Sequence, residues 1–205
     1  MRVKFNKRRP APAPITAKFD DPLSDLFNAD AKVSVVPADA AEPAEAVEET
    51  GDVHPHLLAT ATDALRYMQA GKATVTFKSC KTGTRFTYRI SAPRDDEGKI
   101  DVSSDMRFVA LLNGSDNESS YQYFGFLRRG VFFFGKREKV RVSANAPSAQ
   151  AFKWVWEQLQ SGRNPGSVME IWHEGHCGKC GRKLTVPESI RSGIGPECAA
   201  RMGLV

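Results

Sequence analysis

The 205-residue sequence lacks several features that would decide its class at once. It has no run of about 18 apolar residues, so it contains no candidate membrane-spanning helix. No apolar stretch follows the basic start Met1–Lys4, so no secretory signal is predicted. Cysteine is scarce, with four residues in the whole chain. We therefore expect a reducing, cytoplasmic compartment, where clustered cysteines are more often metal ligands than disulfides.

Signatures of catalysis are also missing. The segment His173-Glu174-Gly175-His176 is one residue short of the His-Glu-x-x-His spacing of zinc proteases. Its adjacent His and Glu do not fit the His-x-Glu pattern of zinc deaminases either. Neither a Gly-x-Ser-x-Gly elbow nor a phosphate-binding P-loop occurs in the chain. The sequence therefore predicts a protein that is not an enzyme.

Charge is distributed unevenly along the chain. Residues 1–18 carry six basic and no acidic side chains, whereas residues 19–52 carry ten acidic side chains against one lysine. Both stretches are rich in Pro and Ala and have little to bury, which predicts a disordered tail over residues 1–52. Within it, Phe19–Phe27 is either solvated or a short amphipathic helix that forms on a partner. Residues 53–205 retain a net charge of +8.

The middle of the chain alternates in ways typical of an antiparallel sheet between two helices. Val75 and Phe77 share one face of a strand, and Lys81–Gly83 forms a short hairpin turn. A later helix has Phe152, Val155, Trp156 and Leu159 as its buried stripe. We predict helices over 56–70 and 147–162, and strands over 73–79, 84–91, 106–112, 120–127, 131–135 and 168–173, with 138–143 a further strand or a continuation.

Three of the four cysteines lie close together near the C-terminus, in Cys177-Gly178-Lys179-Cys180 and in Gly195-Pro196-Glu197-Cys198. A Cys-x2-Cys knuckle followed by a third cysteine is typical of a structural zinc site. Pro196 is well placed to begin a short helix over 196–202, whose N-terminus is expected to favour the Cys198 thiolate. The knuckle and the cysteine on a helix resemble a treble-clef zinc site with Zn²⁺ bound by Cys177, Cys180 and Cys198.

The fourth ligand is less determined by the sequence. His176 adjoins Cys177, and adjacent residues rarely face the same tetrahedral ion. His173 lies on the incoming strand and reaches the ion more easily, so it is the preferred ligand. A carboxylate such as Glu197, or water, is an alternative. Cys80 stands alone on a hairpin and is expected to be a small core or edge residue.

One segment reads His173-Glu174-Gly175-His176-Cys177-Gly178-Lys179-Cys180-Gly181-Arg182-Lys183-Leu184-Thr185-Val186-Pro187-Glu188-Ser189-Ile190, followed by Gly193-Ile194-Gly195-Pro196-Glu197-Cys198. It resembles a domain family of unknown function that is common in phage and prophage proteins. The resemblance is specific over 173–198, looser upstream, and absent from the tail. It implies cysteine ligands, a phage or prophage origin and a bacterial host cytoplasm. It implies no activity.

Aromatic and basic residues alternate over 121–141. In a regular strand, Tyr121 and Tyr123 face away from Phe124 and Phe126, so one set fills the core and the other needs cover. Either helices or the stacked bases of a nucleic acid supply that cover. Together with the charge of +8, this pattern predicts a DNA or RNA partner held by Arg128, Arg129, Lys136, Arg137, Lys179, Arg182 and Lys183.

The sequence as a whole predicts an α+β fold, in which an antiparallel sheet flanked by two helices carries a treble-clef-like zinc module at its C-terminal end. The expected division is a tail over 1–52, an α+β domain over 53–166 and a zinc-binding module over 167–205. The expected function is zinc-stabilised nucleic-acid binding without catalysis. The alternative is a small phage effector or adaptor that binds a host protein through its tail or its zinc module.

Overall fold

The computed structural model describes residues 54–101 and 103–204. The predicted tail over 1–52, including Phe19–Phe27, lies outside the described residues, so its disorder and its partner-binding segment stay predictions. No helix among the described residues has both the length and the apolar character needed to cross a bilayer.

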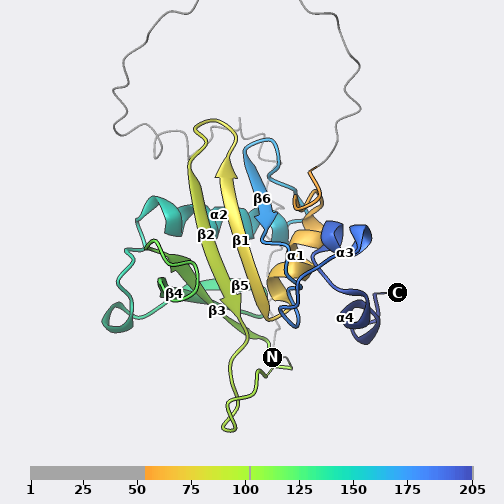
Figure 1. The fold of residues 1–205 in the computed structure, drawn as a ribbon. Coiled ribbons are helices and arrows are strands. Elements are labelled where there is room, and N and C mark those ends of the chain that lie inside the picture. The colour runs from red at the N-terminus through yellow and green to blue at the C-terminus, as the bar shows by residue number, and fades with distance from the viewer. Residues whose placement is uncertain (1–53, 102, 205) are drawn as a thin grey trace, which may run out of the picture. The chain divides into compact units, whose positions relative to one another are not determined.

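The fold is α+β, built on one six-stranded sheet in which every neighbouring pair of strands is antiparallel (Figure 1). The strand order is β5-β4-β3-β2-β1-β6, so the last strand in the sequence lies beside the first. The strands are β1 (Lys72–Ser79), β2 (Arg85–Ser91), β3 (Met106–Leu112), β4 (Tyr121–Arg128), β5 (Val131–Phe134) and β6 (Met169–His173).

One face of the sheet, here called the inner face, forms the core. Alternation in β1 buries Ala73, Val75 and Phe77 on this face, while Thr74 and Thr76 remain half-buried on the other, outer face. A strand side chain points to alternate faces, so a strict two-residue repeat buries one face only. The predicted alternation is therefore confirmed in β1.

Helix α2 (Pro147–Gln160) covers the inner face and lies behind the strands in Figure 1. Its predicted stripe of Phe152, Val155, Trp156 and Leu159 is buried. The Phe152 ring is fully buried and has four aromatic neighbours on the sheet, at centroid distances of 5.0 to 6.0 Å from Phe77, Tyr88, Phe124 and Phe132. Burying a ring of this size stabilises the fold by roughly 1.5–3 kcal/mol.

Helix α1 (Ala61–Gln69) is shorter than the predicted helix over 56–70. The Thr60 side chain accepts a hydrogen bond from the Asp63 amide (3.0 Å), which caps the helix at that point. The preceding residues extend the sheet instead, because the Leu58 amide donates to the Ile171 carbonyl of β6 (2.9 Å). The predicted start at residue 56 is therefore wrong.

A β-bulge in the pairing of β3 with β4 changes which aromatic side chains share a face. The register shifts between Val109 and Ala110, so Phe124 and Gly125 are buried in succession. Phe126 then points to the outer face, where its ring stacks on Phe133 at 5.2 Å. The prediction that Phe126 faces away from Tyr121 and Tyr123 is wrong, because one extra residue reverses the alternation.

Two further segments differ from the predicted elements. The segment considered as a strand over 138–143 instead begins with a single 3-10 turn, η1 (Arg137–Lys139), and continues without strand pairing. The C-terminal region contains the predicted short helix as α4 (Pro196–Arg201) and also an unpredicted one, α3 (Pro187–Ser192). Pro187, at the first position of α3, has the fixed φ that suits a helix start.

Candidate metal centre and sheet surface

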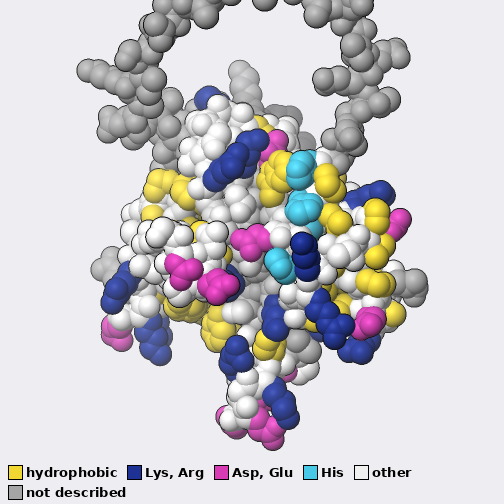
Figure 2. Space-filling view, viewed as in Figure 1, with side chains coloured by type: hydrophobic (Ala, Val, Ile, Leu, Met, Phe, Trp, Pro, Cys, Tyr) yellow, Lys and Arg dark blue, Asp and Glu magenta, His cyan; other side chains and the backbone are white. Residues whose placement is uncertain are grey.

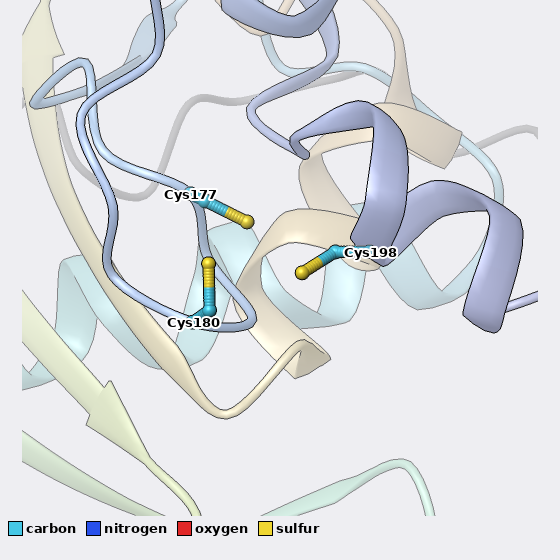
Figure 3. Close-up of side chains that lie close together, drawn as sticks. All are labelled: Cys177, Cys180 and Cys198. Atoms are coloured by element: carbon cyan, nitrogen blue, oxygen red, sulfur yellow. The ribbon is translucent and has the colours of Figure 1, made fainter.

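Strand β6 leads directly into a tight loop that carries the first two cysteines. The Cys177 amide donates to the Arg182 carbonyl (2.7 Å), and the Gly181 amide donates to the Cys177 carbonyl (2.8 Å). Gly181 has a φ of 81°, a left-handed conformation that residues with a Cβ resist. The loop thereby turns the side chains of Cys177 and Cys180 toward the same point (Figure 3).

The third cysteine comes from α4. Helix α3 ends at Gly193, which has a φ of 72°, and the chain then turns through Gly195 into Pro196, the first residue of α4. This return places Cys198 in the first turn of α4, with its sulfur directed at the other two (Figure 3). The two short helices therefore reverse the chain direction and position the Cys198 sulfur next to the Cys177–Cys180 knuckle.

The three sulfurs are spaced as a metal site requires. The Sγ atoms of Cys177, Cys180 and Cys198 all lie within 4.8 Å of one another, and no other His, Cys, Asp or Glu among the described residues joins this group. Tetrahedral Zn–S bonds of about 2.3 Å place sulfurs about 3.8 Å apart, so small side-chain adjustments suffice. Cys177 and Cys198 are buried, with 1% and 8% of their surfaces exposed. The cluster can hold a metal ion.

The acid–base properties of the thiols also fit a bound cation. Burial raises the pKa of the Cys198 thiol to about 12, and the neighbouring Cys180 and Cys177 add to this rise. Burial opposes ionisation of Cys177 as well, but amide donors outweigh it and lower the pKa, among them Gly195 at 3.3 Å from Sγ. The expectation that the helix N-terminus favours the Cys198 thiolate stays a prediction, because burial and the two neighbouring thiols are what raise this pKa. All three thiols can ionise together only if a cation lies among them.

A pocket of about 280 Å³, here called the thiol pocket, opens beside the sulfurs. All three cysteines line it, together with Leu184, Val186 and Pro196 on the apolar side. Its charged lining consists of Arg182, Lys183, Arg201 and Glu197. The metal site therefore adjoins a cavity with three cationic side chains and one carboxylate.

His173, the predicted fourth ligand, is not brought together with the sulfurs. The Gly175 amide donates to its Nδ1 (3.0 Å), and its Nε2 lies 2.6 Å from the Ile190 carbonyl. Burial lowers the pKa of His173 to about 4, with the nearby His56 contributing, so the ring is neutral at pH 7. Both ring nitrogens are thus hydrogen-bonded to backbone groups, and the bond to the Ile190 carbonyl links β6 to α3. Its assignment as a metal ligand is corrected on this geometry.

The alternative ligands lie in different surroundings. His176 is exposed and lines a second pocket, on the outer face of the sheet, rather than the thiol pocket. Glu197 does line the thiol pocket, but its carboxylate pairs with Arg182 (3.7 Å). Cys80 is exposed at the far end of β1, where its thiol lies 3.4 Å from the Gly166 carbonyl.

Tyr67 of α1 seats the metal loop on the rest of the fold. Its side chain is fully buried, and its hydroxyl donates to the carbonyls of Thr74 and His176 (3.3 Å each). Its ring fills the space next to two glycines, since a Cβ at Gly178 or Gly193 would lie 2.8 Å or 2.4 Å from the ring carbon Cδ2. Sequence analysis did not single out Tyr67, because its role depends on the distant loop.

Residues 172–203 match a family of unknown function, DUF6011. The matched segment runs from the end of β6 through the knuckle, α3 and α4, so it contains all three clustered cysteines. Neither the curated proteins nor the solved structures include a match to the chain. The family match therefore covers the region of the cysteine cluster. It gives no information about an activity or about the source organism.

The predicted nucleic-acid-binding side chains do not form one patch. Arg128 and Arg129 lie at one end of the β4–β5 hairpin, where Arg129 pairs with Asp105 (3.4 Å), and Lys136 follows the other end of β5. Arg137 opens η1, and its side chain is not described. Within the matched segment, Lys179, Arg182 and Lys183 belong to the loop that follows β6, the strand at the opposite edge of the sheet. Five strand spacings of about 4.8 Å separate the two edges.

The outer face of the sheet carries an aromatic surface that sequence alternation did not reveal. No described helix covers this face, which is turned to the viewer in Figures 1 and 2. Phe108 and Phe133 are 37% and 44% exposed, and Tyr123 and Phe126 pack beside them. Figure 2 shows some hydrophobic side chains over β3 and β4, and both hydrophobic and basic side chains around the C-terminal helices. We call the set Phe108, Tyr123, Phe126 and Phe133 the ring surface.

A second pocket, of about 320 Å³, lies over β1 and β2 on the same outer face. Lys72, Arg89, Arg94 and His176 line it, together with the carboxylate of Glu174. The Arg89 guanidinium lies 3.8 Å from the centroid of the Tyr121 ring and donates to the carbonyls of Asn117 and Glu118. The outer face therefore combines exposed rings on β3–β5 with a cationic pocket on β1–β2.

Proposed function

We propose that the chain is a zinc-stabilised, non-enzymatic nucleic-acid-binding protein that holds a single strand on the outer face of its sheet. The observation that carries the proposal is the ring surface. Large apolar side chains on an uncovered face are costly unless a partner covers them, and two of these four rings are more than a third exposed. Zinc is the proposed ion because three clustered thiolates are soft donors that suit it.

The chemistry of the face suits single strands. Bases of a single strand expose their flat sides, and stacking one on an aromatic side chain contributes about 1–3 kcal/mol. A duplex buries those flat sides in its own stack, so the ring surface favours unpaired nucleotides. The cationic pocket with Lys72, Arg89 and Arg94 lies on the same face and is suited to hold phosphates.

The structure changes which residues carry the proposal. Arg128 lies on the outer face beside the ring surface, since it follows Phe126 by two residues in β4. Lys179, Arg182 and Lys183 belong to the metal module. In this proposal they therefore hold phosphates away from the ring surface and are not at the centre of the binding face. On the resemblance to phage and prophage proteins, we propose the bacterial host cytoplasm as the place of action.

The experiment measures binding of the full-length protein to fluorescent single-stranded DNA and RNA and to duplex DNA across a salt series. Replacing both Phe108 and Phe133 by Ser removes the two most exposed rings, and we expect at least a tenfold loss of single-strand affinity. Leu204→Ser is the matched control, because Leu204 is similarly exposed (38%) but lies one residue past the matched segment 172–203, outside the sheet.

The salt dependence of binding distinguishes the contribution of ring stacking from that of phosphate contacts. The double ring variant should keep the slope of log affinity against log salt, whereas Arg128→Gln should reduce it by about one. Equal single-strand affinity for the ring variant and the wild type refutes the proposal. A partner protein that is captured from nuclease-treated lysate through the tail or the zinc module, together with no nucleic-acid binding, supports the effector alternative instead.

A further inference from the structure

The chain offers few side chains that could complete the three-cysteine site. Zinc in a structural site takes four ligands, almost always Cys or His. The sequence has four cysteines and four histidines, and all eight lie within the described residues. The undescribed residues therefore contain neither a further thiol nor a further imidazole.

The histidines are engaged elsewhere. Both nitrogens of His173 are bonded to the backbone, at 3.0 Å and 2.6 Å. His56 stacks on His173 with a centroid distance of 4.9 Å, and His54 packs edge-on against Trp172 at 4.7 Å. His176 adjoins Cys177 in the chain but lines the pocket on the outer face of the sheet. Reaching the ion with any of these rings requires breaking a packing contact or rearranging the loop.

The remaining protein donors are also poorly placed. Cys80 follows the end of β1 that is farther from the knuckle, about 25 Å along an eight-residue strand from Lys72, whose amide donates to Gly178. No carboxylate among the described residues joins the three sulfurs. Glu197 is the nearest candidate in sequence, and its carboxylate faces Arg182. The fourth tetrahedral position of an ion bound by the three sulfurs thus faces the thiol pocket and not a protein ligand.

We infer that only Cys177, Cys180 and Cys198 bind the metal, and that its fourth position opens into the thiol pocket, where it takes a small anionic ligand from outside the chain. The pocket has room for such a ligand, at about 280 Å³. Its lining carries three cationic side chains against one carboxylate, which favours an anion over a neutral molecule. Three thiolates, of which Cys177 and Cys198 are buried, together with an accessible fourth position make a ligand-binding site as well as a structural one.

The first test uses cobalt, whose visible absorption bands report the ligand set directly. Full-length protein is loaded with Co²⁺ in place of zinc, and spectra are compared for wild type, His176→Ala, His173→Gln and Glu197→Gln. We expect the bands to stay unchanged in all three variants, with Co²⁺ affinity within about twofold of wild type for His176→Ala and Glu197→Gln. A band shift in any variant means that the replaced side chain closes the site, and the inference is then wrong.

The second test asks whether the fourth position accepts a ligand. Azide, a small anion, is titrated into the Co²⁺-loaded wild type and should shift the bands with saturation, at lower concentrations than neutral imidazole. Replacing Lys183 and Arg201 by Gln should weaken azide binding about three- to fivefold and leave imidazole binding unchanged. A spectrum that does not respond to azide overturns the inference, and so does an equal effect of the double variant on both ligands.

Discussion

A single methyl group at Gly193 tests how the metal loop is seated on α1. Gly193 has a φ of 72°, and a Cβ at this position would lie 2.4 Å from Cδ2 of Tyr67. The Tyr67 ring cannot easily move aside, because it is fully buried and its hydroxyl is held by the Thr74 and His176 carbonyls. Gly193→Ala should therefore displace the loop from the helix.

The magnitude follows from two separate costs. A residue with a Cβ in the left-handed conformation loses about 1 kcal/mol of stability relative to glycine. Overpacking against a fixed ring adds about 2 kcal/mol. Gly83→Ala provides the matched control, since Gly83 has a φ of 70° and a Cβ there would meet no heavy atom within 4 Å. We expect losses of about 3 kcal/mol for Gly193→Ala and about 1 kcal/mol for Gly83→Ala.

Urea unfolding of the metal-loaded protein measures both losses. A chelator competition with Co²⁺ then measures metal affinity, which should fall about tenfold in Gly193→Ala alone. The Gly178 amide donates to the Gly193 carbonyl (3.0 Å), so movement at Gly193 is passed to the residue next to Cys177. Equal stability losses in the two variants, or unchanged metal affinity in Gly193→Ala, would refute this account of Tyr67.

Two other predictions concern acid and metal removal. In NMR titrations the His173 imidazole should take up its proton near pH 4, whereas the unfolded chain does so near pH 6.5, so stability should decrease as the pH falls from 6.5 toward 4. A midpoint near 6.5 would contradict the buried, neutral ring. Cys198→Ser should abolish stoichiometric metal binding and lower the melting temperature as strongly as chelation of the wild type, whereas Cys80→Ser should change neither. Wild-type protein that melts identically with and without a chelator would contradict a structural ion.

Much of the fold could be predicted because it depends on local patterns. Two-residue alternation located β1 and β2, and the stripe from Phe152 to Leu159 identified the face of α2 that packs on the sheet. The Cys-x2-Cys spacing likewise identified two members of the cysteine cluster that can hold a metal ion, since two intervening residues are enough to turn both sulfurs to one point. In each case the residues that decide the structure are neighbours in the chain.

The missed features depend on residues that are far apart in sequence. The β-bulge opposite Val109 reverses the facing of Phe126, and no local pattern in β4 indicates it. His173 looked like a ligand because it precedes the knuckle, yet its ring bonds to Ile190 of a helix that sequence analysis did not predict. The basic side chains were grouped by sequence, but strand order separates them across the sheet.

The position of β6 beside β1 has a consequence for how the protein matures. Val75 of the first strand pairs with His173 of the last, so the free edge of β1 stays open until the C-terminal segment has left the ribosome. Open edges of this kind can pair with other chains, and contacts between distant residues slow folding. The knuckle follows β6 directly, so closure of the edge and capture of the ion belong to the same late event in synthesis. Metal-starved cells should consequently accumulate completed chains that aggregate through β1.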